Sequence, residues 1–232
     1  MQEDHEAVDK AALDPRKRRR GRGQRLTPAE LAALPPGPAP EAGTLRNAAL
    51  AHLARYSATE VGLVRVLDRR IQRWASRAAT FGDPPDRVAE LVASARIAAR
   101  AVATSLVASG VVDDAAYAAA RARSLTRSGR SRRVIGAHLA QRGIDSDLAA
   151  ASLPDDADTE LAAALSQARK RRIGPFAEPD APSDDDPLAE GRARNRALGA
   201  LARAGFSRDV AERALSMERE EADRLILHLK RL

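Results

Sequence analysis

The chain has 232 residues, a formal net charge of +7, 44% hydrophobic and 3% aromatic residues, and no cysteine. The lack of cysteine excludes disulfides and thiol-ligated metal sites and agrees with a reducing cytoplasm. No continuous apolar run approaches the roughly 18 residues of a membrane span, and no apolar N-terminal segment predicts a secretory signal. We therefore expect a cytoplasmic protein without a membrane partner.

The sequence predicts an all-α fold. Alanine makes up about a fifth of the chain, and no run of Val, Ile, Thr and aromatic residues between turn signals is typical of a strand. The six aromatic side chains are scattered along the chain, which favours several thin cores over one thick core.

The first residues predict a basic tail followed by a linker. Residues 1–26 are polar and aperiodic, so we expect them to be disordered. The tail side chains expected to contact DNA are the seven basic groups in the ten positions 16–25: Arg16, Lys17, Arg18, Arg19, Arg20, Arg22 and Arg25. Residues 27–43 predict a short helix, opened by a capping box at Thr27, and a Pro-rich linker.

Ten further helices are expected after the linker. One begins near Thr44; a capping box at residues 57–60 opens a long amphipathic helix; a third, after the break at 81–85, runs to Ser109. Asp113 or Asp114 is the expected N-cap of the next. The remaining helices are expected at roughly 114–127, 131–142, 145–153, 158–172, 188–204, 207–216 and 218–231, with an acidic Pro-rich loop at 178–187.

One sequence segment occurs twice in similar form. LAQRGIDSDLAAASL (139–153) and LARAGFSRDVAERAL (201–215) are identical at six of fifteen positions. Each predicts a helix stopped by glycine, a tight turn and a second helix. Such repetition indicates tandem helical units, each of which would also hold a third helix, although chance similarity in an alanine-rich chain is the alternative. The predicted units are residues 44–110, 111–154, and 155–232, the last including a C-terminal helix.

No catalytic constellation is found. There is no phosphate-binding loop of the G-x-x-x-x-G-K-[ST] type. The four histidines lack metal-ligand spacing, and His52 and His138 are better explained as packing residues. The adjacent Asp113 and Asp114 are better explained as capping residues than as a catalytic pair. We expect no enzyme, no cofactor and no metal.

The segment between Asp114 and Asp145 holds seven arginines and no acid. Arg132 and Arg133 follow the expected N-cap Ser131, where cations oppose the helix dipole. A partner surface explains this better than a solvated basic face, which remains the alternative. The aromatic residues do not interleave with the arginines, so base stacking is not expected. The predicted partner- and DNA-binding residues are Arg121, Arg123, Arg127, Arg130, Arg132, Arg133 and Arg142.

Residues 106–145 resemble the central repeat of the RecX family, the regulators of the RecA recombinase. Residues 47–71 are similar to that family's first repeat and residues 200–215 to its last, although the second helix of the first repeat here runs on through Trp74. The residues that carry the central resemblance are Gly110, Val111, Val112, Asp113, Asp114, Tyr117, Ala118, Arg123, Arg127, Gly129, Arg130, Ile135, Leu139, Gly143, Ile144 and Asp145.

The resemblance implies a non-enzymatic, elongated and curved protein of three tandem three-helix repeats. Such a protein would bind as a monomer along the RecA–DNA filament, contacting the recombinase and single- and double-stranded DNA. It would modulate filament growth, ATP hydrolysis and strand exchange, with inhibition the expected direction. The alternative function is a non-specific DNA-binding repeat protein that acts without a recombinase.

Overall fold

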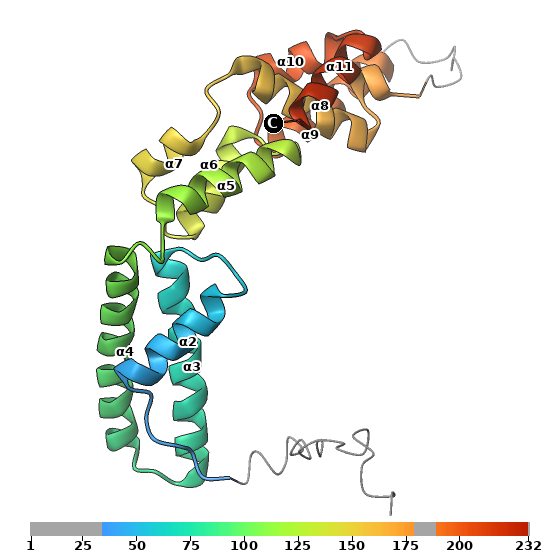
Figure 1. Cartoon of the computed structure of the whole chain (residues 1–232). Coiled ribbons are helices and arrows are strands. Elements are labelled where there is room, and N and C mark those ends of the chain that lie inside the picture. The colour runs from blue at the N-terminus through green and yellow to red at the C-terminus, as the bar shows by residue number, and fades with distance from the viewer. Residues whose placement is uncertain (1–33, 179–188, 232) are drawn as a thin grey trace, which may run out of the picture.

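The computed structural model of the protein describes residues 34–178 and 189–231, and within these ranges it contains ten α-helices, one short 3-10 helix and no strand. Figure 1 shows the helices arranged along a curved, elongated path rather than around one common core. The predictions of an all-α fold and of an elongated array are confirmed. The expected basic tail at 1–26, the short helix after Thr27 and nearly all of the acidic loop at 178–187 lie outside the described residues.

The first repeat consists of three helices: α2 (Ala42–Leu53), α3 (Glu60–Phe81) and α4 (Pro85–Ala108). Thr59 rather than Ser57 is the N-cap of α3, because the Thr59 hydroxyl accepts a hydrogen bond from the backbone amide of Gly62 at 2.9 Å. The largest buried side chains of this repeat are Leu45, Leu63, Leu67, Ile71 and Leu106.

The second repeat has the smallest core. Its helices are α5 (Asp114–Arg127), α6 (Arg132–Gln141) and α7 (Ser146–Ser152). Asp113, Ser131 and Asp145 are their N-caps. Asp113 is one of the two caps predicted for α5, and Ser131 is the cap predicted for α6. Three branched side chains and three alanines fill the space between them: Ile135, Leu139, Ile144, Ala118, Ala122 and Ala149.

The third repeat is larger because it carries two additional elements. Its helices are α8 (Ala157–Arg171), α9 (Ala189–Arg203), α10 (Arg208–Ser216) and the C-terminal α11 (Arg219–Leu229). The 3-10 helix η3 (Gly174–Phe176), which the sequence did not predict, places Phe176 in the core beside Leu165 and Ile226. The guanidinium groups of Arg169 and Arg219 lie over the Phe176 ring, 5.2 and 5.9 Å from its centroid.

The repeated sequence segment, residues 139–153 and 201–215, has the same structure in both places. Gly143 and Gly205 end α6 and α9 with φ angles of +81° and +91°, in the left-handed region that favours glycine. The amide of the apolar residue after each glycine donates to the carbonyl five residues earlier, at 3.1 and 3.2 Å. The predicted helix, tight turn and helix are therefore confirmed, and the two segments are equivalent parts of consecutive repeats.

The buried residues form three separate clusters, each drawn from one stretch of the chain. The first spans residues 45–112, the second 118–149 and the third 161–229. Val112 packs with the first cluster although it follows the predicted boundary at residue 110. The division into units 44–110, 111–154 and 155–232 stays a prediction about which segments unfold together.

Helix α4 is long and apolar enough to cross a membrane by length and composition alone, with a mean hydropathy of 1.4 in its most apolar window. Only 28% of that window is buried. Its inner side nevertheless belongs to the first core cluster through Ala95, Ala99, Val102, Ala103 and Leu106. A packed core helix of a helical domain passes the same test, so this feature is weak evidence of a membrane span.

Candidate partner and nucleic-acid interface

The seven arginines of the second repeat fall into two groups, at opposite ends of α6. Arg142 is the C-cap of α6, and Arg121 on α5 packs near the same end of that helix. A helix of ten residues, about 15 Å long, separates Arg142 from the beginning of α6. The other group lies in the last turns of α5, the connecting turn and the first turn of α6: Arg123, Arg127, Arg130, Arg132 and Arg133.

Arg121 contributes to packing within the second repeat. Its Nε donates a hydrogen bond to Nε2 of His138 at 3.1 Å, and both side chains are half-buried. Burial lowers the pKa of His138, and the positive charges of Arg121 and Arg142 lower it further. His138 therefore accepts from Arg121 as a neutral imidazole, in agreement with its predicted packing role.

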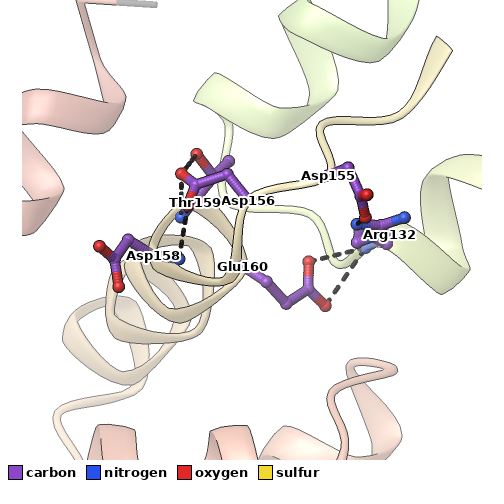
Figure 2. Close-up of polar contacts among 6 residues, drawn as sticks. All are labelled: Arg132, Asp155, Asp156, Asp158, Thr159 and Glu160. Atoms are coloured by element: carbon purple, nitrogen blue, oxygen red, sulfur yellow. Dashed lines mark hydrogen bonds and ion pairs between the residues drawn. The ribbon is translucent and has the colours of Figure 1, made fainter.

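Arg132 belongs to the joint between the second and third repeats. Figure 2 shows two acids of the third repeat approaching it. The backbone amide of Arg132 donates to both carboxylate oxygens of Glu160, at 3.0 and 3.3 Å, and its Nη1 lies 2.8 Å from Oδ1 of Asp155. Burial raises the pKa of Glu160, although its contacts with Arg132 oppose this shift.

These contacts correct one premise of the sequence argument. No acid lies between Asp114 and Asp145 in the sequence. Folding nevertheless brings Glu160 and Asp155 to the first turn of α6, where negative charge complements the helix dipole. Arg132 is therefore explained at least in part by the fold. The other four members, Arg123, Arg127, Arg130 and Arg133, are exposed, and their side chains make no hydrogen bond or ion pair with any described residue. We call these four side chains the exposed arginine cluster.

The charge of Glu160 gives a test of this joint. The Glu160→Gln variant keeps an acceptor oxygen for the Arg132 amide but cannot ionise. The pKa of Glu160 is raised above its ordinary value of 4.5 in the folded protein, so folding favours the protonated carboxyl. This stabilisation is present below pH 4.5 and is lost as the pH rises through the raised pKa. We compare the melting temperature of the variant minus that of the unmodified protein. This difference is expected to be more positive at pH 7 than at pH 4. An identical difference at both pH values would contradict this.

The joint between the first and second repeats is built in the same way. At both joints, the hydroxyl of a helix N-cap donates a hydrogen bond to a backbone carbonyl of the next repeat. The N-cap belongs to the second helix of its repeat. The carbonyl belongs to the residue just before the glycine that ends the second helix of the next repeat. Thr59 Oγ1 lies 2.6 Å from the Arg142 carbonyl oxygen, and Ser131 Oγ lies 2.8 Å from that of Ala204. The N-terminus of α3 therefore meets the C-terminal end of α6, and the N-terminus of α6 meets the C-terminal end of α9, so the three helices are joined head to tail.

A carboxylate from the next repeat's first helix completes each joint. The amide of Glu60, the first residue of α3, donates to Oδ1 of Asp114 at 2.9 Å, as the amide of Arg132 does to Glu160. Asp114 was predicted to be a capping residue, and it caps α3 while Asp113 caps α5. Sequence reasoning missed the joint role of Thr59 and Glu160. Aligning the N-caps of the first two repeats, Thr59 and Ser131, would have revealed it.

The described residues contain no group of three or more His, Asp or Glu side chains arranged to hold a metal ion. What they do present is a row of equivalent helical repeats with exposed arginines that no acid neutralises. These features define a protein of the helical-repeat class, whose exposed arginines suit an acidic or polyanionic partner.

Comparison with known proteins identifies the family. A sequence profile described as RecX, second three-helix domain, matches residues 113–153. Regulatory protein RecX of Myxococcus xanthus (strain DK1622) is 37% identical over 173 residues, which are 74% of this chain and 83% of that protein. The chain belongs to the RecX family, a family of regulatory proteins.

One solved structure agrees in fold, and a second was compared. The crystal structure of a regulatory protein RecX superposes with a TM-score of 0.52 at 21% identity, over 76% of this chain and 72% of the other. The crystal structure of RecX from Lactobacillus salivarius gives a TM-score of 0.45 at 17% identity, over 79% and 97% of the two chains.

Proposed function

We propose that this protein regulates a RecA recombinase by binding along the recombinase–DNA filament, and that it inhibits filament growth, ATP hydrolysis and strand exchange. Membership of the RecX family supports the partner. The observation that carries the proposal is the exposed arginine cluster, because Arg123, Arg127, Arg130 and Arg133 have no acidic partner among the described residues. Guanidinium groups suit both the phosphates of DNA and the carboxylates of a protein surface.

The arrangement of the repeats supports binding along a filament rather than at one point. Three repeats joined head to tail through α9, α6 and α3 form an extended body that can contact neighbouring subunits of a helical assembly (Figure 1). In this proposal the protein acts as a cytoplasmic monomer without catalysis or cofactor. The basic residues of the tail, Arg16 to Arg25, add contacts to DNA phosphates.

The proposal is tested by titrating the protein into fixed amounts of RecA and single-stranded DNA and following ATP hydrolysis while the filaments assemble. Inhibition is expected at ratios well below one molecule per recombinase subunit, since capping a growing filament end requires few molecules. If hydrolysis falls only when the protein is in excess over nucleotides, it competes for DNA. The alternative function, a non-specific DNA-binding protein without a recombinase partner, would then be favoured.

A further inference from the structure

A hollow of about 680 Å³ opens beside the joint between the first and second repeats. Three parts of the chain that are distant in the sequence meet there: the stretch from the end of α2 into α3, the first half of α5 and the end of α6. Its most chemically informative lining residues are His52, Tyr56, Arg65, Arg69, Tyr117 and Arg142. This size is within the range of sites that hold small molecules or single nucleotides.

The hollow carries positive charge that the described residues do not neutralise. Its lining includes three arginines and no carboxylate. Arg69 and Arg142 are exposed, and their guanidinium groups make no hydrogen bond or ion pair with the described part of the chain. Arg65 uses Nη1 to donate to the Gln141 carbonyl at 2.7 Å, and it lies one turn from Arg69 on the same face of α3.

The acids nearest to these arginines in the sequence have other contacts. Asp145, three residues after Arg142, accepts from the amide of Asp147 at 2.8 Å. Asp68 forms an ion pair with Arg96 of α4 at 2.8 Å, and Glu60 accepts a hydrogen bond from the Thr104 hydroxyl at 2.7 Å. The arginines of the hollow are therefore available to an external anion, and their forked donors match the oxygens of a phosphate.

Aromatic rings stand among these arginines. The Tyr56 side chain is 62% exposed, which is unusual for a large ring, and the His52 ring supports it at a centroid distance of 5.3 Å with a 37° tilt. Tyr117, half-buried on α5, contributes a second ring to the lining. Along the sequence the aromatic residues do not interleave with arginines, but the joint brings the two types together.

We propose that this hollow binds one nucleotide of an unpaired strand, with the base against a tyrosine ring and the phosphate at Arg69 and Arg142. Base stacking on aromatic side chains combined with a cationic path for the backbone is the usual chemistry of single-strand binding. A paired base stays stacked within its duplex and does not enter a hollow without flipping out. An acidic peptide would satisfy the arginines but would leave the tyrosine faces unused.

The inference deepens the proposed function and rests on it for the source of the strand. It assigns unpaired DNA to the first joint, whereas the exposed arginine cluster lies at the second. Strand binding by this protein alone, without recombinase, tests the hollow separately from any effect on ATP hydrolysis. A failure of the proposed function would appear in the hydrolysis assay and leave the binding assay unchanged.

The test compares the full chain with its Tyr56→Leu variant by fluorescence anisotropy on two strands of equal length, oligothymidine and an abasic analogue. Tyr56→Leu is expected to weaken binding to oligothymidine by about tenfold, the loss of one stacked base, and to leave binding to the abasic strand unchanged. The tail's phosphate contacts are common to both strands and cancel in this comparison. Phe81→Leu is the matched control, because Phe81 is 54% exposed on α3 and lies outside the hollow.

The phosphate arm uses Arg69→Ala, which is expected to weaken binding to both strands and to lower the salt slope by about 0.7. Circular dichroism melting of each variant separates a loss of contact from a loss of fold. Equal losses on base-bearing and abasic strands for Tyr56→Leu, or no loss on either, would overturn the proposal. An equal loss would show that Tyr56 acts on the strand's backbone or on the shape of the hollow, and no loss would point to a ligand recognised only by its charge.

Discussion

The Gly143→Ala variant is expected to unfold at a clearly lower temperature than the unmodified protein, because position 143 is constrained in two ways. Its φ of +81° is costly for any residue with a Cβ, by about 1–2 kcal/mol. A Cβ built there would lie 2.5 Å from Cβ and Cγ2 of Val61, a stiff side chain in the first turn of α3. Accommodating alanine thus requires the second repeat to move away from the first.

That movement breaks more than one contact. The Thr59 hydroxyl reaches the carbonyl of Arg142, the residue just before the glycine, at 2.6 Å. We expect a total cost of about 2–5 kcal/mol, the sum of backbone strain and overpacking, which corresponds to a fall in melting temperature of roughly 5–15 °C. Thermal unfolding followed by circular dichroism measures it.

Gly110→Ala is the matched control. Gly110 also has a positive φ, +70°, and also follows a helix, but no atom lies within 4 Å of the position of its Cβ. Gly110→Ala therefore has the same kind of backbone strain as Gly143→Ala but lacks the steric overlap. If Gly110→Ala and Gly143→Ala lower the melting temperature equally, the close approach at the first joint does not contribute to stability.

The sequence predicted the helices well because their ends are determined by neighbouring residues. The capping side chains of Asp113, Ser131 and Asp145 act within three residues, and so does the left-handed glycine that ends α6. Such local chemistry can be recognised in a single sequence. The start of α3 was less sharply predicted, because Ser57 and Thr59 are both competent caps; Thr59 is the N-cap, accepting from the Gly62 amide and donating to the Arg142 carbonyl. Helix α2 begins at Ala42, two residues before the predicted start near Thr44.

The candidate site was only partly predictable, because its geometry depends on contacts between distant segments. Arg132 was expected to be free, but it meets Asp155 and Glu160, which lie 23 and 28 residues later. Arg65 and Arg69 were not considered, because only the first joint brings α3 to the end of α6. An arginine-rich run predicts that a basic surface exists, but folding decides which of its charges remain unpaired.

Replacing three members of the exposed arginine cluster is expected to reduce inhibition of the recombinase about tenfold or more without lowering stability. The variant is Arg127→Ala, Arg130→Ala and Arg133→Ala together. These side chains make no hydrogen bond or ion pair with the described residues. Removing like charges from one corner relieves repulsion, which offsets the favourable position of Arg127 in the last turn of α5. Arg132 is left in place, since its loss would also remove the ion pair with Asp155.

The readouts distinguish the two partners that arginines can serve. If the cluster contacts DNA phosphates, the triple variant should show a salt slope for duplex binding that is lower by about 2–3. If it contacts acidic residues of the recombinase, DNA binding should be unchanged while inhibition of ATP hydrolysis is lost.

A charge-matched control separates this surface from net charge. The Arg87→Ala, Arg100→Ala and Arg213→Ala variant also removes three exposed arginines, two on α4 and one on α10, all outside the second repeat. A purely electrostatic attraction set by the overall charge of +7 would weaken equally in both variants. Retention of full inhibition by the cluster variant, or equal losses in the two, would show that this corner of the second repeat is not the partner surface.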